Sequence, residues 1–265
     1  MATGFHDPGR TVLRMQGADA KGVLQSVVTN DLDRLAEDRA LYAALLTPQG
    51  KYLFDFFLIA DGDDVLIDIA ATRAQAFAAR VKMYCLRRDA RMGEPTGLSV
   101  ALAWGADEPD RSGRRVLTDP RHAALGWRLY GPVETVAADL TPAEAADYTA
   151  LRVSLSVPES GVELVPEDTF ILEAGFEALD GVDFRKGCYV GQEVTARMKH
   201  KTTLKKRLVP VRVEGAAPPG TPVTAKGKPA GTLFSQADGR GLAHLRLDRA
   251  TGEMEAGEAR VTYDG

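Results

Sequence analysis

Apolar and polar positions show two different spacings along the N-terminal part of the chain. After Asp19, a residue typical of helix N-caps, apolar residues recur at helical spacing from Val23 to Val28. Elsewhere, short apolar runs bounded by turn residues are typical of β-strands. The strands predicted in this way are Val12–Gly17, Ala40–Leu46, Tyr52–Ala60 and Val65–Ala70.

A hairpin and a second helix complete this part of the pattern. The segment Thr47–Gly50 contains Pro and Gly and favours a hairpin turn between two of the strands. A helix is predicted from about Thr72, with an apolar face that extends to Cys85 and Arg88. Because Cys85 lies on that face, we interpret its thiol as part of the core.

Residues 93–140 are less regular, with strand candidates at Leu98–Trp104 and Gly126–Tyr130. The segment Thr141–Glu144 then has the composition of a capping box, with Pro at the first helical position. It predicts a helix that continues to about Val153.

The C-terminal part of the chain has a different pattern of predicted secondary structure. From Leu208 it is a series of short strands separated by Gly- and Pro-containing turns, which is typical of a small closed barrel. We therefore expect two regions, 1–204 and 205–265, the first of them with two interleaved subdomains. The five strands predicted for the barrel are Val209–Val213, Pro222–Ala225, Gly231–Phe234, Gly241–Leu247 and Ala259–Tyr263.

The composition of the 265 residues is ordinary for a globular protein, with 45% hydrophobic and 26% charged residues. A net charge of −4 gives no general sign of nucleic-acid or membrane binding. No apolar run is long enough for a membrane span, and the first residues do not resemble a secretory signal. Two cysteines cannot form a disulfide framework, so we expect a reducing cytoplasm.

The segment Leu172–Arg197 carries the densest chemical information. Gly187 and Gly191 bracket Cys188, which suggests backbone turns that residues with a Cβ would resist. A helix is predicted to start after Gly191, so Cys188 would precede a helix N-terminus beside two cations, Arg185 and Lys186, and favour the thiolate. The alternative is a cysteine packed as a small hydrophobe in a tight turn.

Positive charge is concentrated in the same part of the chain. From Arg185 to Arg207 there are eight Lys and Arg residues and one acid, Glu193. This segment could attract a polyanion such as a polyglutamate tail, RNA or an acidic protein, or it could be a solvated charged strip. The sequence contains no P-loop, and its four His residues do not have the spacing of metal ligands.

A resemblance to a known family sharpens this picture. The octapeptide Lys186-Gly-Cys-Tyr-Val-Gly-Gln-Glu193 resembles the signature of the YgfZ-type folate-binding family, which includes mitochondrial iron–sulfur assembly factors and is related to the aminomethyltransferase (T protein) of the glycine cleavage system. The segments Gln49–Asp55 and Leu172–Gly175 are similar to further family motifs, as is the N-terminal helix region. The resemblance implies an α+β, aminomethyltransferase-like folate-binding fold with ferredoxin-like units and a C-terminal small β-barrel.

The resemblance also implies site residues. Glu173 matches the T-protein glutamate that holds the pterin ring, and a carboxylate can accept two hydrogen bonds from that planar edge. The T protein has adjacent acids where this chain has Phe54 and Asp55, so we expect no catalytic acid there. Cys188 is the implied catalytic thiol. The candidate folate contacts are Glu173, Asp55, Lys186, Gly187, Tyr189, Gly191, Gln192, Glu193 and Arg197.

The implied function is that of a tetrahydrofolate-binding factor that assists assembly or repair of iron–sulfur clusters in client proteins. Whether it catalyses a reaction stays open, since the resemblance implies a transferase-like protein without classical aminomethyltransferase activity. The alternatives are a true aminomethyltransferase or other one-carbon transferase, and an accessory protein for tRNA-modification enzymes. We expect a monomer without a membrane partner. We also expect no permanent metal or cluster, because a stable cluster typically takes about four thiolates.

Overall fold

An antiparallel five-stranded sheet forms the centre of the N-terminal part of the protein. The computed structural model describes residues 1–201 and 203–265. The strand order in this sheet is β3-β4-β5-β2-β6. Its elements are β2 (Arg10–Gln16), β3 (Leu41–Leu46), β4 (Tyr52–Asp61), β5 (Asp64–Ala70) and β6 (Arg91–Pro95), with the helices α1 (Ala20–Val27), η1 (Leu32–Arg34) and α2 (Ala71–Lys82).

Both faces of this sheet are covered, which explains why its strands are continuous apolar runs. Every residue of β3 is buried. One face packs against α1 and α2, around Leu24, Phe56 and Phe77. The other face packs against a second sheet and the segment 155–190, around Tyr42 and Phe176. The central strands therefore need apolar side chains on both faces.

The helices differ in detail from the sequence prediction. The Asp19 carboxylate does not cap α1, because it accepts a hydrogen bond from Asp89 N at 2.9 Å instead. Helix α2 ends at Lys82, so Cys85 lies in the turn that follows it. The Cys85 thiol donates to Val81 O and packs half-buried against the core of the first sheet.

A second sheet has the strand order β10-β1-β7-β9-β8. The capping box predicted at Thr141 is wrong, because Thr141 N bonds to Ala2 O and extends this sheet. Helix α3 starts later, with a capping box formed by Glu144 and Asp147. The elements here are β1 (Thr3–His6), β7 (Ser99–Trp104), β8 (Arg115–Thr118), η2 (Ala123–Leu125), β9 (Trp127–Gly131), β10 (Thr141–Pro142) and α3 (Ala145–Ser154).

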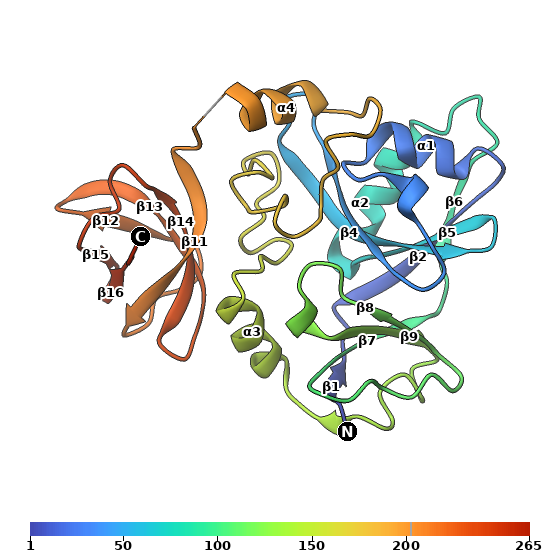
Figure 1. Ribbon diagram of the computed structural model, residues 1–265, viewed down its shortest axis with the longest axis horizontal. Coiled ribbons are helices and arrows are strands. Elements are labelled where there is room, and N and C mark those ends of the chain that lie inside the picture. Colours follow the sequence, from blue (N-terminus) through green and yellow to red (C-terminus); the bar gives the residue numbers. More distant parts are fainter. Residues whose placement is uncertain (202) are drawn as a thin grey trace.

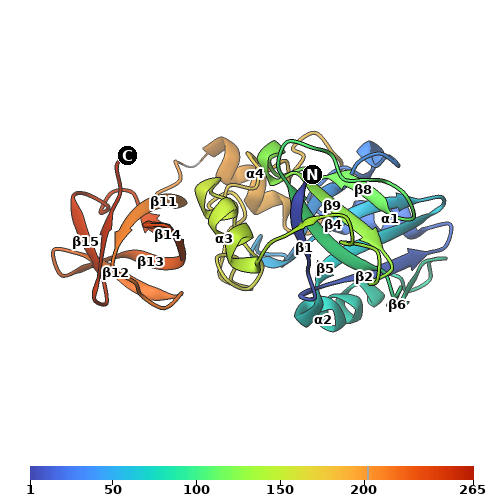
Figure 2. The same ribbon diagram turned by 90° about the horizontal axis from the view of Figure 1, so that it is seen from below.

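The C-terminal region is a closed barrel that stands beside the two sheets (Figure 1, Figure 2). It has six described strands, not the five predicted, because the short strand β15 alternates charged and buried residues and lacks an apolar run. Helix α4 (Gln192–Lys201) precedes the barrel. The barrel strands are β11 (Lys206–Glu214), β12 (Thr221–Ala225), β13 (Lys228–Ala237), β14 (Arg240–Arg246), β15 (Glu253–Ala256) and β16 (Ala259–Thr262).

Buried polar contacts fix the barrel to the rest of the protein, which we call the body (residues 1–201). In Figures 1 and 2, α3 and α4 lie between the barrel and the sheets. Arg152 of α3 pairs with the fully buried Glu163 carboxylate at 3.1 Å and donates to the Ser235 hydroxyl of β13. Glu163 also accepts from Ser235 N at 3.1 Å. The predicted α+β class with a C-terminal barrel is confirmed.

Candidate functional site

The signature octapeptide packs directly on the β3–β4 hairpin. Gly191 has a φ of +84°, and a Cβ there would lie 2.7 Å from Thr47 O. Gly50 of the hairpin has a φ of +75°, and its Cβ would lie 2.9 Å from the Val194 side chain. Both glycines are required by positive φ and close approach. The two motifs that carry the family resemblance are therefore neighbours in space.

Lys186 is buried and points at the end of helix α1. Its ammonium donates to the carbonyls of Gln25, Val28 and Asn30 at 2.8, 2.6 and 2.9 Å. These carbonyls have no partner within the helix, so a cation at the helix C-terminus satisfies them. Burial lowers the pKa of Lys186 to about 8. Because the three bonds use all three donors, Lys186 holds the signature turn on α1 in place of a ligand.

Cys188 is exposed, whereas Lys186, two residues before it, and Tyr189, directly after it, are buried. Burial raises the pKa of Tyr189 to about 12, which keeps its phenol neutral. Helix α4 starts at Gln192, so the predicted position of Cys188 just before a helix is found. Gly187 does not have the special turn predicted for it, since its φ is not positive and a Cβ there would meet open space. The thiol is therefore presented to solvent by a turn anchored on both sides.

Asp55 lies inside the body and its carboxylate is already satisfied. It accepts hydrogen bonds from Tyr52 Oη at 2.7 Å and Tyr42 Oη at 3.1 Å. Burial first, and then the Asp55 charge, raise the pKa of both phenols, so they remain donors. Tyr52 also contacts Ser160 Oγ at 2.9 Å. The structure places Asp55 in a closed network, and does not bring it together with Glu173.

Glu173 lines a cavity of about 660 Å³ between the body and the barrel, which we call the barrel cavity. The Glu173 side chain is 14% exposed, and its Oε2 lies 3.2 Å from His244 Nε2 of β14. Among the described residues, no hydrogen bond reaches the Glu173 carboxylate, and the buried His244 Nε2 has no hydrogen-bond partner. The cavity is lined from the body by Phe170, Glu173 and Met198 and from the barrel by Gly231, Thr232 and His244.

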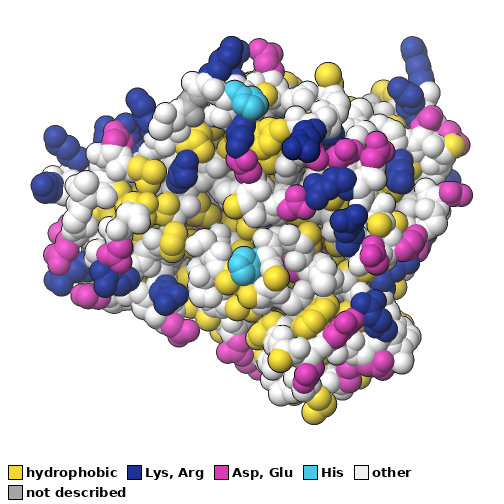
Figure 3. All heavy atoms as spheres, viewed as in Figure 1, with side chains coloured by type: hydrophobic (Ala, Val, Ile, Leu, Met, Phe, Trp, Pro, Cys, Tyr) yellow, Lys and Arg dark blue, Asp and Glu magenta, His cyan; other side chains and the backbone are white. Residues whose placement is uncertain are grey.

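Cationic residues surround the barrel cavity. Lys51 lies 3.6 Å from the centre of the Phe170 ring, and Arg249 donates to Pro229 O at 2.9 Å. Lys and Arg side chains occur on both sides of the junction between barrel and body, among acidic and apolar side chains (Figure 3). Exposed cations beside a partly buried carboxylate suit a ligand with a hydrogen-bonding head and an anionic tail. The cationic lining residues are Lys51, Lys205, Lys206, Arg246 and Arg249.

The remaining candidates of the signature lie on α4. Glu193 and Arg197 form an exposed ion pair at 3.0 Å, and Lys199 pairs with Glu177. Gln192 is the first residue of the helix and is half-buried. With Lys186 buried and Lys205 in the barrel cavity, the basic segment is divided among several surroundings.

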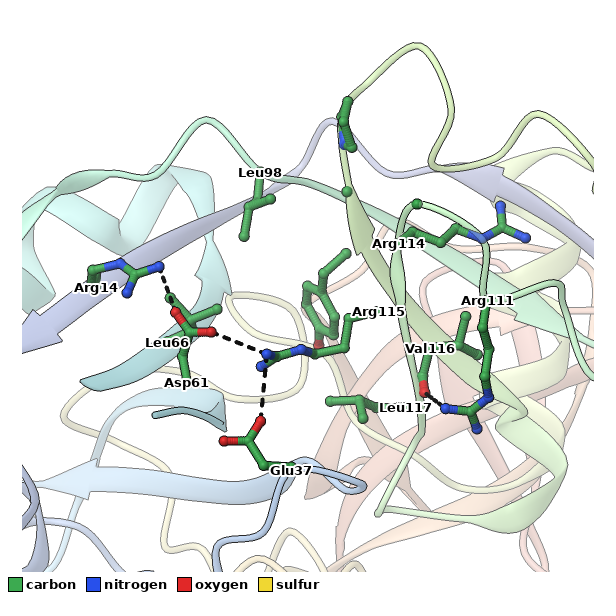
Figure 4. Close-up of a pocket in the computed structure, with 14 residues that line it drawn as sticks. Arg14, Glu37, Asp61, Leu66, Leu98, Arg111, Arg114, Arg115, Val116 and Leu117 are labelled. Atoms are coloured by element: carbon green, nitrogen blue, oxygen red, sulfur yellow. Dashed lines mark hydrogen bonds and ion pairs between the residues drawn. The ribbon is translucent and has the colours of Figure 1, made fainter. Parts of the chain in front are cut away.

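A second cavity, of about 520 Å³, lies between the two sheets of the body, and we call it the sheet cavity. Figure 4 shows Arg115 between Asp61 and Glu37, with Arg14 on the far side of Asp61. The Arg115 distances are 3.1 Å to Asp61 and 3.5 Å to Glu37. Arg14 and Arg115 pair with carboxylates of this cavity, whereas Arg111 and Arg114 pair with Glu108 and Asp139 outside it. No candidate from the sequence lines the cavity.

Sequence reasoning missed two groups of polar residues. One is a buried network in which Arg128 pairs with Asp68 at 2.6 Å, and Asp68 also accepts from Arg10 at 2.7 Å. The signal was available, because Asp68 is a single charge inside an apolar strand. The other is His244, whose partner in the body could not be read from the sequence of the barrel.

Neither a metal-type cluster of side chains nor a membrane-spanning helix is found in the part of the chain that the structure describes. Within residues 1–201 and 203–265, no three His, Cys, Asp or Glu side chains gather as a metal site would require. In the same residues, no helix is both long and apolar enough to cross a membrane.

Comparison with known proteins gives consistent results for the whole chain and for the barrel. Residues 205–264 match the family model described as the CAF17 C-terminal beta-barrel domain. The human mitochondrial iron–sulfur cluster assembly factor IBA57 is 31% identical, over 94% of this chain and 79% of its own length. Its mouse counterpart is 30% identical over 95% and 80%. A homologue from the fungus Pyricularia oryzae is 31% identical over 96% and 74%.

The fold has a close counterpart among solved structures. The glycine cleavage system aminomethyltransferase T from Bartonella henselae superposes with a TM-score of 0.80, over 98% of this chain and 84% of that one, at 15% identity. The predicted aminomethyltransferase-like fold is therefore confirmed. The IBA57 relatives are named as mitochondrial, and this finding contradicts the cytoplasmic location predicted from the sequence, which is wrong.

Proposed function

The chain belongs to the IBA57 family of iron–sulfur cluster assembly factors, and from this premise we propose that it binds a reduced folate in the barrel cavity. The folate would support assembly or repair of clusters in client proteins. The narrower YgfZ-type assignment rests on the signature octapeptide Lys186–Glu193. The observation that carries the folate proposal is the Glu173 carboxylate, which is mostly buried and accepts no hydrogen bond from the described residues.

A pterin supplies what this carboxylate lacks. Its 2-amino group and ring N3–H form a planar edge with two donors, which matches the two oxygens of Glu173. A buried acceptor without a donor costs about 1–3 kcal/mol, so a ligand that donates to it gains that free energy on binding. The cavity volume of about 660 Å³ lies within the range of small-molecule sites, roughly 300–1,000 Å³.

The cations of the barrel cavity suit the other end of the ligand. Folates carry an anionic glutamate tail, and Lys205, Lys206 and Arg249 are exposed residues of the cavity lining. Attraction between exposed charges is modest and screened by salt. We therefore assign affinity mainly to Glu173 and tail recognition to these cations.

Cys188 is the residue that we propose to act on cluster chemistry. Its thiol is exposed, and the buried Lys186 and Tyr189 fix the backbone on either side. An aminomethyltransferase reaction is not part of the proposal. Phe54 occupies the place of one acid of the T protein, and Asp55 is bonded to two tyrosines.

Calorimetry with tetrahydrofolate under anaerobic conditions tests the proposal. We expect one site per chain, and expect Glu173→Ala to weaken binding by ~1–3 kcal/mol, which is about fivefold to 150-fold. Glu177→Ala is the matched control, since Glu177 is an exposed glutamate of the same segment. Equal affinity of the Glu173 variant and the wild type would remove Glu173 from the site. Cells that lack the gene should regain cluster-enzyme activity with the wild type, and not with the Glu173 variant.

A further inference from the structure

His244 projects from the barrel toward the body. Along β14, Ala243 and Leu245 belong to the barrel core, so the alternation of a strand places His244 on the outer side. That side faces the barrel cavity and Glu173. The barrel thus contributes a second polar group to the same end of the cavity.

The position of His244 relative to Glu173 is fixed by contacts of the backbone. Leu208 N of β11 donates to Glu173 O at 2.7 Å, and β11 is the neighbour of β14 in the barrel. On the other side of β14, Gly231 of β13 comes so close that a Cβ would lie 2.2 Å from His244 O. The two side chains therefore belong to different regions of the chain but are held in register.

The two groups offer complementary chemistry. Glu173 offers two acceptors, and His244 Nε2 can carry an N–H donor. His244 Nε2 is buried and has no hydrogen-bond partner among the described residues, although Glu173 Oε2 is 3.2 Å away. The two atoms lie at ion-pair distance when His244 is protonated, but neither makes a hydrogen bond with the described residues, so both retain hydrogen-bonding capacity for a ligand.

We infer that His244 and Glu173 together read the three-point edge of a 4-oxo pterin. Glu173 accepts from the 2-amino group and N3–H, and His244 Nε2–H donates to the 4-oxo oxygen. This inference rests on the proposed folate site and adds a specificity-determining residue from the barrel. A 4-amino pterin carries a donor where the 4-oxo oxygen would be, so His244 discriminates against it.

The test compares tetrahydrofolate with tetrahydroaminopterin, which differs in the group on C4 and otherwise matches it. Anaerobic calorimetry of the wild type should show about tenfold or greater preference for tetrahydrofolate. His244→Leu should lose about tenfold in affinity for tetrahydrofolate and little for tetrahydroaminopterin, so that the preference collapses. His244→Gln keeps an N–H donor at similar reach and should restore much of the preference. Arg240→Leu, an exposed residue of the same strand, is the control.

The outcomes separate this inference from the proposed function. If the wild type does not bind tetrahydrofolate, the folate proposal fails and this inference fails with it. If Glu173→Ala loses binding while His244→Leu keeps both affinity and preference, the inference alone is overturned. An equal loss for both ligands in His244→Leu also overturns it, because His244 would then only shape the cavity. Thermal unfolding of each variant shows that the comparison is made on folded protein.

Discussion

The sheet cavity and the barrel cavity are similar in size and both are rich in cations, yet their charges are arranged in opposite ways. In the sheet cavity, Arg14, Arg111, Arg114 and Arg115 each pair with a carboxylate of the chain. In the barrel cavity, the ion pairs found among its five cationic residues in the described structure involve only Arg246, with Asp248. The presence of arginine or lysine does not define a ligand site. What distinguishes the barrel cavity is Glu173, whose carboxylate accepts no hydrogen bond from the described residues, whereas Asp61 of the sheet cavity accepts one from Arg115.

Because buried charges are costly to leave without partners, a satisfied and an unsatisfied carboxylate differ in their effect on the free energy of folding. Asp68 is fully buried, and Arg10 and Arg128 together satisfy it; they hold the pKa of its carboxyl below its usual range although desolvation acts in the other direction. Removing one member of such a set leaves an uncompensated buried charge. Among the described residues, the Glu173 carboxylate has no such set of hydrogen bonds, and it lies 3.2 Å from His244 Nε2 of the barrel. The Asp68 network therefore stabilises the fold, whereas Glu173 and His244 are available to a ligand.

The largest effect should come from opening a closed network. Arg128→Met should reduce the free energy of unfolding by ~3–5 kcal/mol, because Asp68 loses its closest partner inside the core. Denaturant unfolding followed by circular dichroism measures it. Arg212→Met removes an exposed ion pair with Asp264 and should leave stability nearly unchanged. A stability loss below about 1 kcal/mol for Arg128→Met would break the comparison.

Replacing Lys186 should have an effect on stability between those of Arg128→Met and Arg212→Met, because its charge is buried but its partners are neutral carbonyl groups. Lys186→Met should cost ~1–3 kcal/mol by leaving carbonyls at the end of α1 without a donor. Arg185→Met, an exposed neighbour, should be neutral. Chemical denaturation of both variants decides between this structural role and a ligand-binding role, in which stability would be unaffected and folate affinity would fall.

The same lysine gives a pH dependence with a definite sign. Burial lowers its pKa in the folded protein to about 8, against 10.5 in an unfolded chain. Between these values the unfolded state binds more protons, so the stability contributed by Lys186 rises with pH. The stability difference between wild type and Lys186→Met should therefore grow from pH 8 to 10.5. A difference that is constant or shrinks over this window would show that the pKa is not lowered.

Much of this architecture could be predicted from local sequence patterns. Particular residues show which features such patterns cannot predict. The closed barrel follows from the strand spacing, although the short strand β15, which has no apolar run, was missed. Thr141 looked like a helix cap, but pairing with β1 competes for the same backbone and prevails. Lys186 looked like an activating charge for Cys188, because its true partners lie far away along the chain, at the end of α1. Partners distant in sequence cannot be inferred from spacing.

The candidate site shows the same limit. Glu173 was predicted from the family resemblance, and it lines the barrel cavity. Asp55 was a reasonable candidate, but the hydroxyl groups of Tyr42 and Tyr52 occupy it. His244 lies within the predicted barrel strand Gly241–Leu247, but the sequence analysis gave it no role. Its contact with Glu173 depends on how two regions dock, which local sequence patterns do not specify.

The next prediction compares the cations of the two cavities directly. The double variant Lys205→Gln/Lys206→Gln should weaken binding of triglutamyl tetrahydrofolate by about threefold to tenfold at low salt, with a smaller effect on the monoglutamate. Arg14→Gln/Arg115→Gln should leave both affinities unchanged, because these arginines are paired within the protein. Calorimetry at two salt concentrations checks it. If the arginine variant alone loses tail recognition, the two cavities have been assigned in reverse.

The last prediction compares the exposed thiol of Cys188 with the half-buried thiol of Cys85, and a small change in stability is expected at Cys188. Cys85 donates to Val81 O, and burial raises the pKa of its thiol, so little thiolate is present near neutral pH. Cys188 is exposed and should react with iodoacetamide much faster. Because Ser is nearly isosteric and the thiol lies in solvent, Cys188→Ser should keep stability within ~1 kcal/mol while losing support of cluster enzymes. Peptide mapping after alkylation, thermal unfolding and complementation of a deletion strain measure the three quantities. A Cys188→Ser variant that is stable and fully active would reduce the signature to a folding turn that anchors α4 to the hairpin.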